Sequence, residues 1–151
     1  MLEKEYGPGI LSADGSLDRQ KLLAILLSSP DEKARIEQII HPEVLRIMDR
    51  DLAAARKKSV DTVVVEVPLL YETGMEKLFD MVAVVTAPFE ERLRRVMKRN
   101  GTGEDIARKW LETQMPQEEK AAMADVVIAN NGTLEELGQE VRNFAERIRR
   151  L

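Results

Sequence analysis

Three arginines in the second half of the chain have a spacing that could serve phosphate chemistry. Arg92, Arg95 and Arg99 are three and four positions apart, so in a helix they project from one face. Guanidinium groups bind phosphate oxygens through a fixed two-pronged geometry, and phosphoryl transfer develops negative charge on such oxygens. The alternative is a solvated helix face, which is the commoner origin of a run of charges.

The single histidine, His41, limits the other catalytic chemistries. A Ser-His-Asp triad requires a positioned serine, but the chain has no G-x-S-x-G sequence, and Ser28 and Ser29 lie in sequence typical of helix ends. One histidine cannot build a multi-histidine metal site, and without cysteine there is no thiolate site. We therefore expect neither a hydrolase triad nor a metal site, and His41 by itself suits a polar residue at a helix break.

Further candidate residues follow short β-branched segments. Ligands of parallel α/β sheets bind beyond the carboxyl ends of the strands. Leu70, Tyr71 and Glu72 come shortly after the run at 62–67, and an Asn-Asn-Gly turn at 130–132 follows a later run. As isolated patterns, the apolar residues equally suit a core at a strand end, Glu72 a helix cap or solvent, and the turn an ordinary strand-to-helix connection.

The elements that would position these residues alternate along the chain. β-branched runs at 62–67, 81–85 and 125–129 predict strands, and helical patterns lie between them. This order predicts an α/β fold with a parallel sheet and right-handed crossovers. The remaining predictions are a loop at 5–15, helices at about 16–27, 30–52, 88–99 and 102–113, and a C-terminal helix at 134–148, with Ser16 and Thr133 as N-caps.

The helix predicted from Pro30 has a strong start and an internal proline. Ser29, Pro30 and an acid three residues after Ser29 form the signature of a capped helix N-terminus. Pro42 lacks an N–H group, so we expect the helix to kink or restart there. Such a break would leave His41 exposed.

Composition narrows the class of protein. A chain of 151 residues with 44% hydrophobic and 33% charged side chains predicts one globular domain with a core. No run approaches the roughly 20 apolar residues that span a bilayer, and we expect a cytoplasmic protein without membrane contact. The net charge of −4 does not provide the broad positive field of a non-specific nucleic-acid binder.

Long stretches of the sequence resemble one enzyme family. Residues 41–80 join a His-Pro pair in a helix to a strand followed by PLLYE, and they are flanked by EYGPGILSADGSLDR and TQMPQEEKAAMADVVIANNGTLEEL. Together these segments are similar to dephospho-CoA kinases over nearly all 151 residues. The resemblance implies a P-loop kinase-like three-layer parallel sheet with a helical lid at about 92–122, in a single domain spanning 1–151.

The implied function is ATP-dependent phosphorylation of the 3′-hydroxyl of dephospho-CoA, the last step of coenzyme A synthesis. Dephospho-CoA and ATP are the expected partners, with Mg²⁺ as cofactor. By resemblance, His41 contacts the CoA moiety, Leu70, Tyr71 and Glu72 lie beside the acceptor, and Arg19 meets a phosphate of the acceptor.

Other residues are expected on the nucleotide side. Arg95 and Arg99 match the L-x-R-x-x-x-R pattern at the base of the lid and are the expected catalytic phosphate contacts. Asn130, Asn131 and Gly132 match a loop that lies near the adenine in the family.

The lid sequence departs from the family pattern in two places. Arg92 stands where the family often has glutamine, and Trp110 stands where the lid arginine is usual. Trp110 cannot donate a charge, so Arg108 or Lys109 is the expected substitute for nucleotide binding.

A further departure concerns the phosphate-binding loop. Family members begin with a strand and a G-x-x-x-x-G-K-[ST] loop, whereas none of the eight glycines here precedes a lysine. We therefore expect the ATP-binding segment to be missing, and the chain alone to be an impaired kinase. The alternatives are a non-catalytic module that keeps the CoA side and a helical interaction module derived from the kinase. In the family the first strand lies between those at 62–67 and 81–85, so its absence predicts open sheet edges and a homo-oligomer or marginally stable chain.

Overall fold

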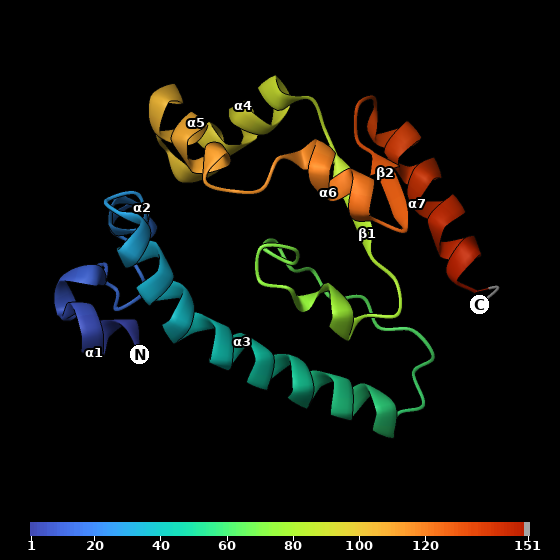
Figure 1. Ribbon diagram of the computed structural model, residues 1–151, viewed down its shortest axis with the longest axis horizontal. Helices are drawn as coiled ribbons and strands as arrows, with labels where there is room; N and C mark the ends of the chain where they lie inside the picture. The colour runs from blue at the N-terminus through green and yellow to red at the C-terminus, as the bar shows by residue number, and fades with distance from the viewer. Residues whose placement is uncertain (150–151) are drawn as a thin grey trace. The chain divides into compact units, whose positions relative to one another are not determined.

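The computed structural model describes residues 1–149, which form two compact units that divide between Val64 and Val65 (Figure 1). None of the helices in this range is both long and apolar enough to cross a membrane. The elements of the first unit are α1 (Leu2–Tyr6), the 3₁₀ helix η1 (Pro8–Ile10), α2 (Arg19–Leu26) and α3 (Pro30–Lys57). Those of the second unit are η2 (Met75–Leu78), β1 (Ala83–Thr86), α4 (Phe89–Asn100), α5 (Glu104–Glu112), α6 (Gln117–Met123), β2 (Val126–Ala129) and α7 (Leu134–Ile148).

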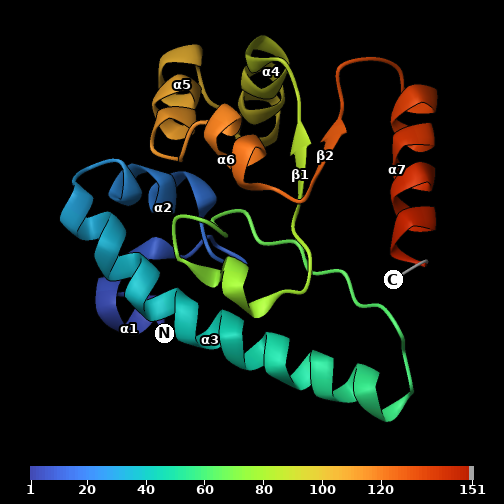
Figure 2. The same cartoon turned by 45° about the vertical axis from the view of Figure 1, so that its right-hand side comes forward.

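The long helix α3 begins where its sequence predicts. The Ser29 hydroxyl accepts the backbone N–H of Glu32 at 3.1 Å, and Pro30 occupies the first helical position. The expected restart at Pro42 is wrong, because α3 continues through it as one helix (Figure 2). Proline removes a single N–H donor, and the hydrogen-bonded turns on both sides keep the helix together. His41 is accordingly half-buried in an unbroken helix rather than exposed at a break.

The start of the first unit differs in detail from the sequence prediction. Part of the expected loop at 5–15 is helical, since α1 and η1 extend into it. The N-cap of α2 is Asp18 and not Ser16, because the Asp18 carboxylate accepts the N–H groups of Gln20 and Lys21 at 3.0 and 3.1 Å. Ser16 belongs instead to the preceding turn, where its hydroxyl donates to Asp14 at 2.6 Å. A carboxylate directly before the helix reaches these amides better than a serine two positions earlier.

Side chains of α3 hold α1 in place. The Tyr6 hydroxyl donates to Glu32 at 2.8 Å, and Arg35 forms an ion pair with Glu5 at 2.6 Å. The buried apolar residues of this unit are Ile10, Leu23, Ile36 and Met48.

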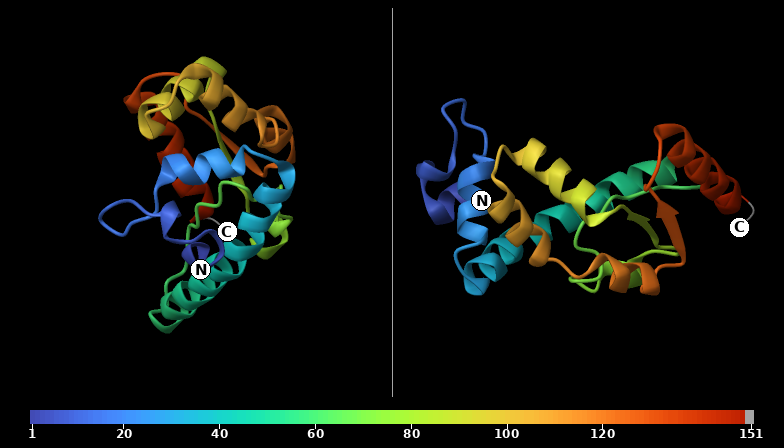
Figure 3. Two further views of the ribbon diagram at one scale, coloured as in Figure 1. Left: turned by 90° about the vertical axis from the view of Figure 1, so that its left-hand side faces the viewer. Right: turned by 90° about the horizontal axis from the view of Figure 1, so that it is seen from above.

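The second unit contains a small parallel sheet. β1 and β2 pair in parallel, with Ala83 opposite Val126 and Thr86 opposite Ala129. The helix α6 contacts β1, and α7 lies along β2 (Figures 2 and 3). This confirms the predicted α/β class and the strands expected near 81–85 and 125–129.

The strand predicted at 62–67 is wrong. These residues are extended but have no ladder partner in the described part of the chain. A strand is stabilised by hydrogen bonds to a neighbouring strand, so a β-branched run without a neighbour does not form one. Val63 and Val64 of this run are accordingly exposed, Val64 to 79%, whereas Val65 and Val67 are half-buried.

Two helices that pack on each other, α4 and α5, form the compact part of the predicted lid. Leu93, Val96 and Ala107 are buried together, and Phe89 and Trp110 pack against them. A glycine, Gly101, with φ 63° ends α4 and allows the turn between the helices. The predicted helices at 88–99 and 102–113 are therefore confirmed to within about two residues.

The C-terminal helix α7 also starts where its sequence predicts. Thr133 and Glu136 form a reciprocal capping box, in which each side chain bonds the backbone N–H of the other residue.

Candidate functional site

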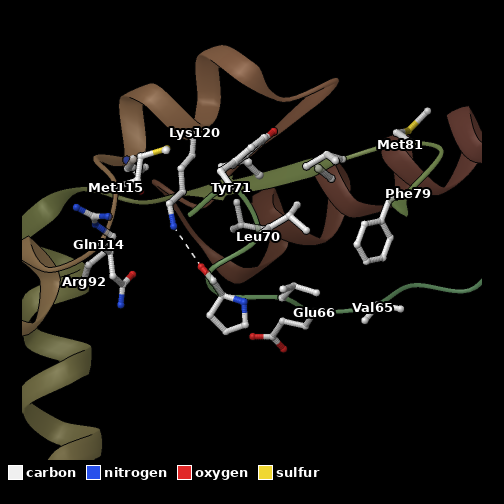
Figure 4. A pocket seen from close by; sticks show the side chains of 17 residues that line it. Val65, Glu66, Leu70, Tyr71, Phe79, Met81, Arg92, Gln114, Met115 and Lys120 are labelled. Atoms are coloured by element: carbon white, nitrogen blue, oxygen red, sulfur yellow. Dashed lines mark hydrogen bonds between the residues drawn. The ribbon is translucent and has the colours of Figure 1, made fainter. Parts of the chain in front are cut away.

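The second unit encloses a cavity of about 410 Å³ that runs along β1 (Figure 4). Its lining comes from the extended residues 65–68, from Leu70 and Tyr71, from residues 81–85 and from the connection between α5 and α6. Figure 4 shows the polar side chains of Arg92, Gln114 and Lys120 toward one end of the cavity. The cavity therefore combines a cationic end with mainly apolar walls, to which Glu66 adds one acidic side chain.

The segment after Pro68 is a series of tight turns. The Thr73 amide bonds the Leu69 carbonyl at 3.1 Å, and the Met75 amide bonds the Leu70 carbonyl at 3.0 Å. These turns carry two predicted acceptor residues, Leu70 and Tyr71, to the wall of the cavity.

The Tyr71 hydroxyl is buried without a hydrogen-bond partner among the described residues. Burial raises the pKa of Tyr71, and the charges of Asp125 and Glu76 raise it further. The phenol therefore stays neutral and keeps an O–H available to donate.

Glu72, the third residue predicted from this segment, is held from two directions. Its Oε1 atom lies 2.6 Å from Lys120 Nζ and accepts the Met115 N–H at 3.0 Å. Burial raises the pKa of Glu72, but the hydrogen bond from Lys120 and bonds from backbone amides outweigh it, so the net pKa lies below the ordinary value. Unlike Leu70 and Tyr71, Glu72 does not line the cavity.

The structure distributes the arginines of α4 differently from the sequence prediction. Arg95 Nε bonds Glu91 at 2.9 Å, and Arg99 Nε bonds the Asn100 side chain at 3.2 Å; neither residue lines the cavity. Arg92 does line it, with its guanidinium 5.6 Å from the Phe89 ring and a buried Nε that has no partner in residues 1–149.

Sequence reasoning placed Arg92 on the arginine face of the helix but favoured the two residues that match the family pattern. The signal that could have singled out Arg92 is its position at the start of α4, directly after β1.

Arg108 and Lys109, the expected substitutes for the usual lid arginine, have different surroundings on α5. Arg108 forms an ion pair with Glu104 at 2.8 Å, and its guanidinium lies 5.0 Å from the centre of the Phe89 ring. Its charge is therefore already paired within the second unit. Lys109 is exposed, whereas Trp110 packs on the Leu93 core. Trp110 therefore serves the packing of this helix pair.

The predicted adenine-side turn lies at the carboxyl end of β2. The Asn130 amide donates to the Thr86 carbonyl at 2.7 Å, which holds the ends of both strands together. Asn131 and Gly132 are exposed after it. A Cβ on Gly132 would overlap Glu136 Oε2, so a larger residue there would have to displace the capping carboxylate.

Two predicted acceptor residues belong to the first unit. Arg19 is the exposed first residue of α2, and His41 is half-buried in α3. This unit has its own cavity of about 370 Å³, lined mainly by apolar side chains of residues 1–17 and 39–47. Neither Arg19 nor His41 is among the residues that line it.

Comparisons with known proteins agree on one family. The model of the dephospho-CoA kinase family matches residues 1–136. The dephospho-CoA kinase of Carboxydothermus hydrogenoformans is 37% identical over 142 residues, which cover 94% of this chain and 69% of that protein. The dephospho-CoA kinase of Geobacillus kaustophilus is 40% identical over 136 residues, covering 90% and 68%.

Solved structures extend the similarity to the fold. A crystal structure of a Thermus thermophilus protein matches with a TM-score of 0.71 and 33% identity over 97% of this chain and 74% of that one. Dephospho-CoA kinase from Campylobacter jejuni matches with a TM-score of 0.61 and 27% identity over 97% and 75%.

Proposed function

This chain belongs to the dephospho-CoA kinase family, and from that premise we propose that it serves the ATP-dependent phosphorylation of the 3′-hydroxyl of dephospho-CoA. The observation that carries the proposal is the family match over residues 1–136. It is supported by the tight turns after Pro68, which present Leu70 and Tyr71 to a cavity with a cationic end.

The residues divide into an acceptor side and a phosphate side. In this proposal Leu70 and Tyr71 of the second unit bind dephospho-CoA. Arg19 and His41 of the first unit keep the substrate-binding role that the family resemblance implies. Apolar walls suit the uncharged parts of the acceptor, and the buried Tyr71 hydroxyl can donate a hydrogen bond to it.

On the phosphate side, Arg95 and Arg99 stabilise the charge of the transferred phosphoryl group, and Arg92 adds a cation beside the cavity. Arg108, Lys109 and the turn at 130–132 contact the nucleotide. To bind phosphate, Arg95 and Arg99 must leave their present partners, Glu91 and Asn100. Guanidinium groups bind phosphate oxygens favourably because two N–H groups can donate in parallel.

We propose that these 151 residues, assayed by themselves, bind dephospho-CoA but catalyse phosphoryl transfer weakly or not at all. They contain no G-x-x-x-x-G-K-[ST] sequence to cradle ATP phosphates. No group of three or more acidic or histidine side chains in residues 1–149 could hold a metal ion, so we assign no step to Mg²⁺. A module that binds dephospho-CoA without catalysis is the second candidate function.

A phosphotransfer assay with Mg-ATP and dephospho-CoA tests the proposal. CoA formation is followed by mass spectrometry against a no-enzyme control, and calorimetry measures the binding of each substrate separately. We expect dephospho-CoA binding with little or no CoA formed. Rapid CoA formation would show that catalysis does not need a G-x-x-x-x-G-K-[ST] loop within these residues, and absence of dephospho-CoA binding would contradict both candidate functions.

A further inference from the structure

Lys120 links two stretches of chain that are distant in sequence. Its ammonium group lies 2.6 Å from Glu72 Oε1, and the two side chains are only 15% and 17% exposed. The same ammonium donates to the Pro68 carbonyl at 3.1 Å, as the dashed line in Figure 4 shows. Lys120 thus bonds to both the first and the last residue of the segment 68–72.

The other end of the contact is equally constrained. Glu72 Oε1 also accepts the Met115 N–H at 3.0 Å, so one carboxylate oxygen joins the turn segment to α6 and to the chain that precedes it. An ion pair so shielded from water is screened less than a surface pair, and removing one partner leaves the other charge largely buried and unpaired.

Between the two anchored residues lie the side chains that face the cavity. Leu70 and Tyr71 line it, whereas Glu72 does not. Lys120 itself lies at the cationic end of the same cavity. The anchors therefore determine how Leu70 and Tyr71 are presented.

We propose that Lys120 is a positioning residue that clamps 68–72 through Glu72 and the Pro68 carbonyl, so that Leu70 and Tyr71 are held ready for the acceptor. The inference rests on the proposed acceptor-binding function. It changes the role of Glu72 from a substrate contact to a support, and it adds Lys120, which sequence reasoning did not select.

The first variant is Lys120→Met, which removes the charge and nearly keeps the length of the side chain. The second is Glu72→Gln, which has the same shape as the original residue, so that a changed Kd in both variants is not explained by a folding defect of one. Lys120→Arg tests rescue by a conservative change. Lys98→Met is the control for loss of one positive charge, because Lys98 is exposed on α4.

Two measurements are made on the full chain. Calorimetry measures the Kd for dephospho-CoA. NMR measures hydrogen exchange at the amides of 73–75, which are bonded within the turn segment, with the Leu137 amide in α7 as an internal reference.

We expect Lys120→Met and Glu72→Gln each to raise the Kd about tenfold and to speed exchange at 73–75 by a similar factor, the loss typical of one charged hydrogen bond. The double variant should be no worse than either single one, and Lys120→Arg should restore most of both properties. Lys98→Met and the Leu137 reference should not change beyond the error of the method.

An unchanged Kd in Lys120→Met and Glu72→Gln, or unchanged exchange at 73–75, would overturn the positioning role. If the unsubstituted chain does not bind dephospho-CoA, the proposed function fails and the acceptor role of Lys120 fails with it. The exchange data would still show separately whether the clamp exists.

Discussion

At Glu72 two opposing effects act on one carboxyl group. Burial disfavours its charged form, whereas the bonds from Lys120 and the Met115 amide favour it, and the second effect is larger. A carboxyl whose folded pKa is depressed stabilises the fold when ionised. That stability is present above the ordinary pKa and is lost as the pH falls through the lowered folded pKa.

This linkage predicts a difference in acid stability between the chain and its Glu72→Gln variant. Between about pH 6 and pH 3 the free energy of unfolding should fall less in the variant, because the variant has no carboxylate to protonate at this position. Urea unfolding across this range measures it. Glu104→Gln, which removes an exposed partner of Arg108, is the control for the loss of one surface carboxylate. Parallel curves for the parent and Glu72→Gln would refute the assignment.

The α4 arginines allow a matched comparison at the same scale. Arg94 and Arg95 both pair with Glu91, but only Arg95 matches the phosphate-contact pattern. Arg95→Ala should weaken the residual ATP binding of these 151 residues about tenfold, the loss expected for a charged contact to phosphate, and Arg94→Ala should leave it unchanged. Calorimetry with ATP decides between them, and equal effects would indicate that α4 acts only through its total charge.

At the scale of elements, α7 depends on its N-terminal cap. Thr133 accepts the Glu136 amide, and the Glu136 carboxylate reaches back to the Thr133 amide. Thr133→Ala should lower the free energy of unfolding by about 1 kcal/mol. Thermal unfolding with Thr62→Ala as control measures it, since Thr62 lies in an exposed extended segment. A loss of equal size in both variants would exclude a specific capping effect.

The α4–α5 pair depends instead on a small shared core. Leu93 is 3% exposed and packs with Trp110, so Leu93→Ala should cost about 2–5 kcal/mol in unfolding free energy. Leu134→Ala is the control, because Leu134 is 87% exposed at the start of α7. The fluorescence of Trp110 during urea unfolding reports the loss locally. A small effect of Leu93→Ala would mean that the helix pair is held by other contacts.

At the scale of the whole molecule, the open sheet is the dominant feature. β1 and β2 form a sheet of two strands, and Val63 and Val64 of the unpaired segment at 62–67 are exposed. Exposed apolar extended chain promotes association with other chains. The oligomer predicted from the sequence therefore remains a prediction with a structural reason.

Sedimentation over a range of concentrations tests this prediction. The parent chain should associate as its concentration rises, and Val64→Lys should reduce the association by placing a charge on the exposed segment. Val141→Lys, at a 47% exposed position of α7, should have no such effect. A parent chain that stays monomeric at all concentrations would contradict the prediction.

The sequence alone determined the features that depend on neighbouring residues. The starts of α3 and α7 were predictable because a cap side chain bonds an amide only three residues away. The end of α4 was predictable because glycine adopts a positive φ without strain. The family was recognisable because its motifs are short and occur in a fixed order along the chain.

Tertiary structure alone decided the features that depend on distant partners. The run at 62–67 has strand composition, but only a neighbouring strand could make it one. Arg92 rather than Arg95 lines the cavity because the direction of α4 relative to β1 selects the face. Lys120 meets Glu72 only after the chain has folded, since no local pattern encodes a contact between an ammonium on α6 and a carboxylate in a turn far earlier in the sequence.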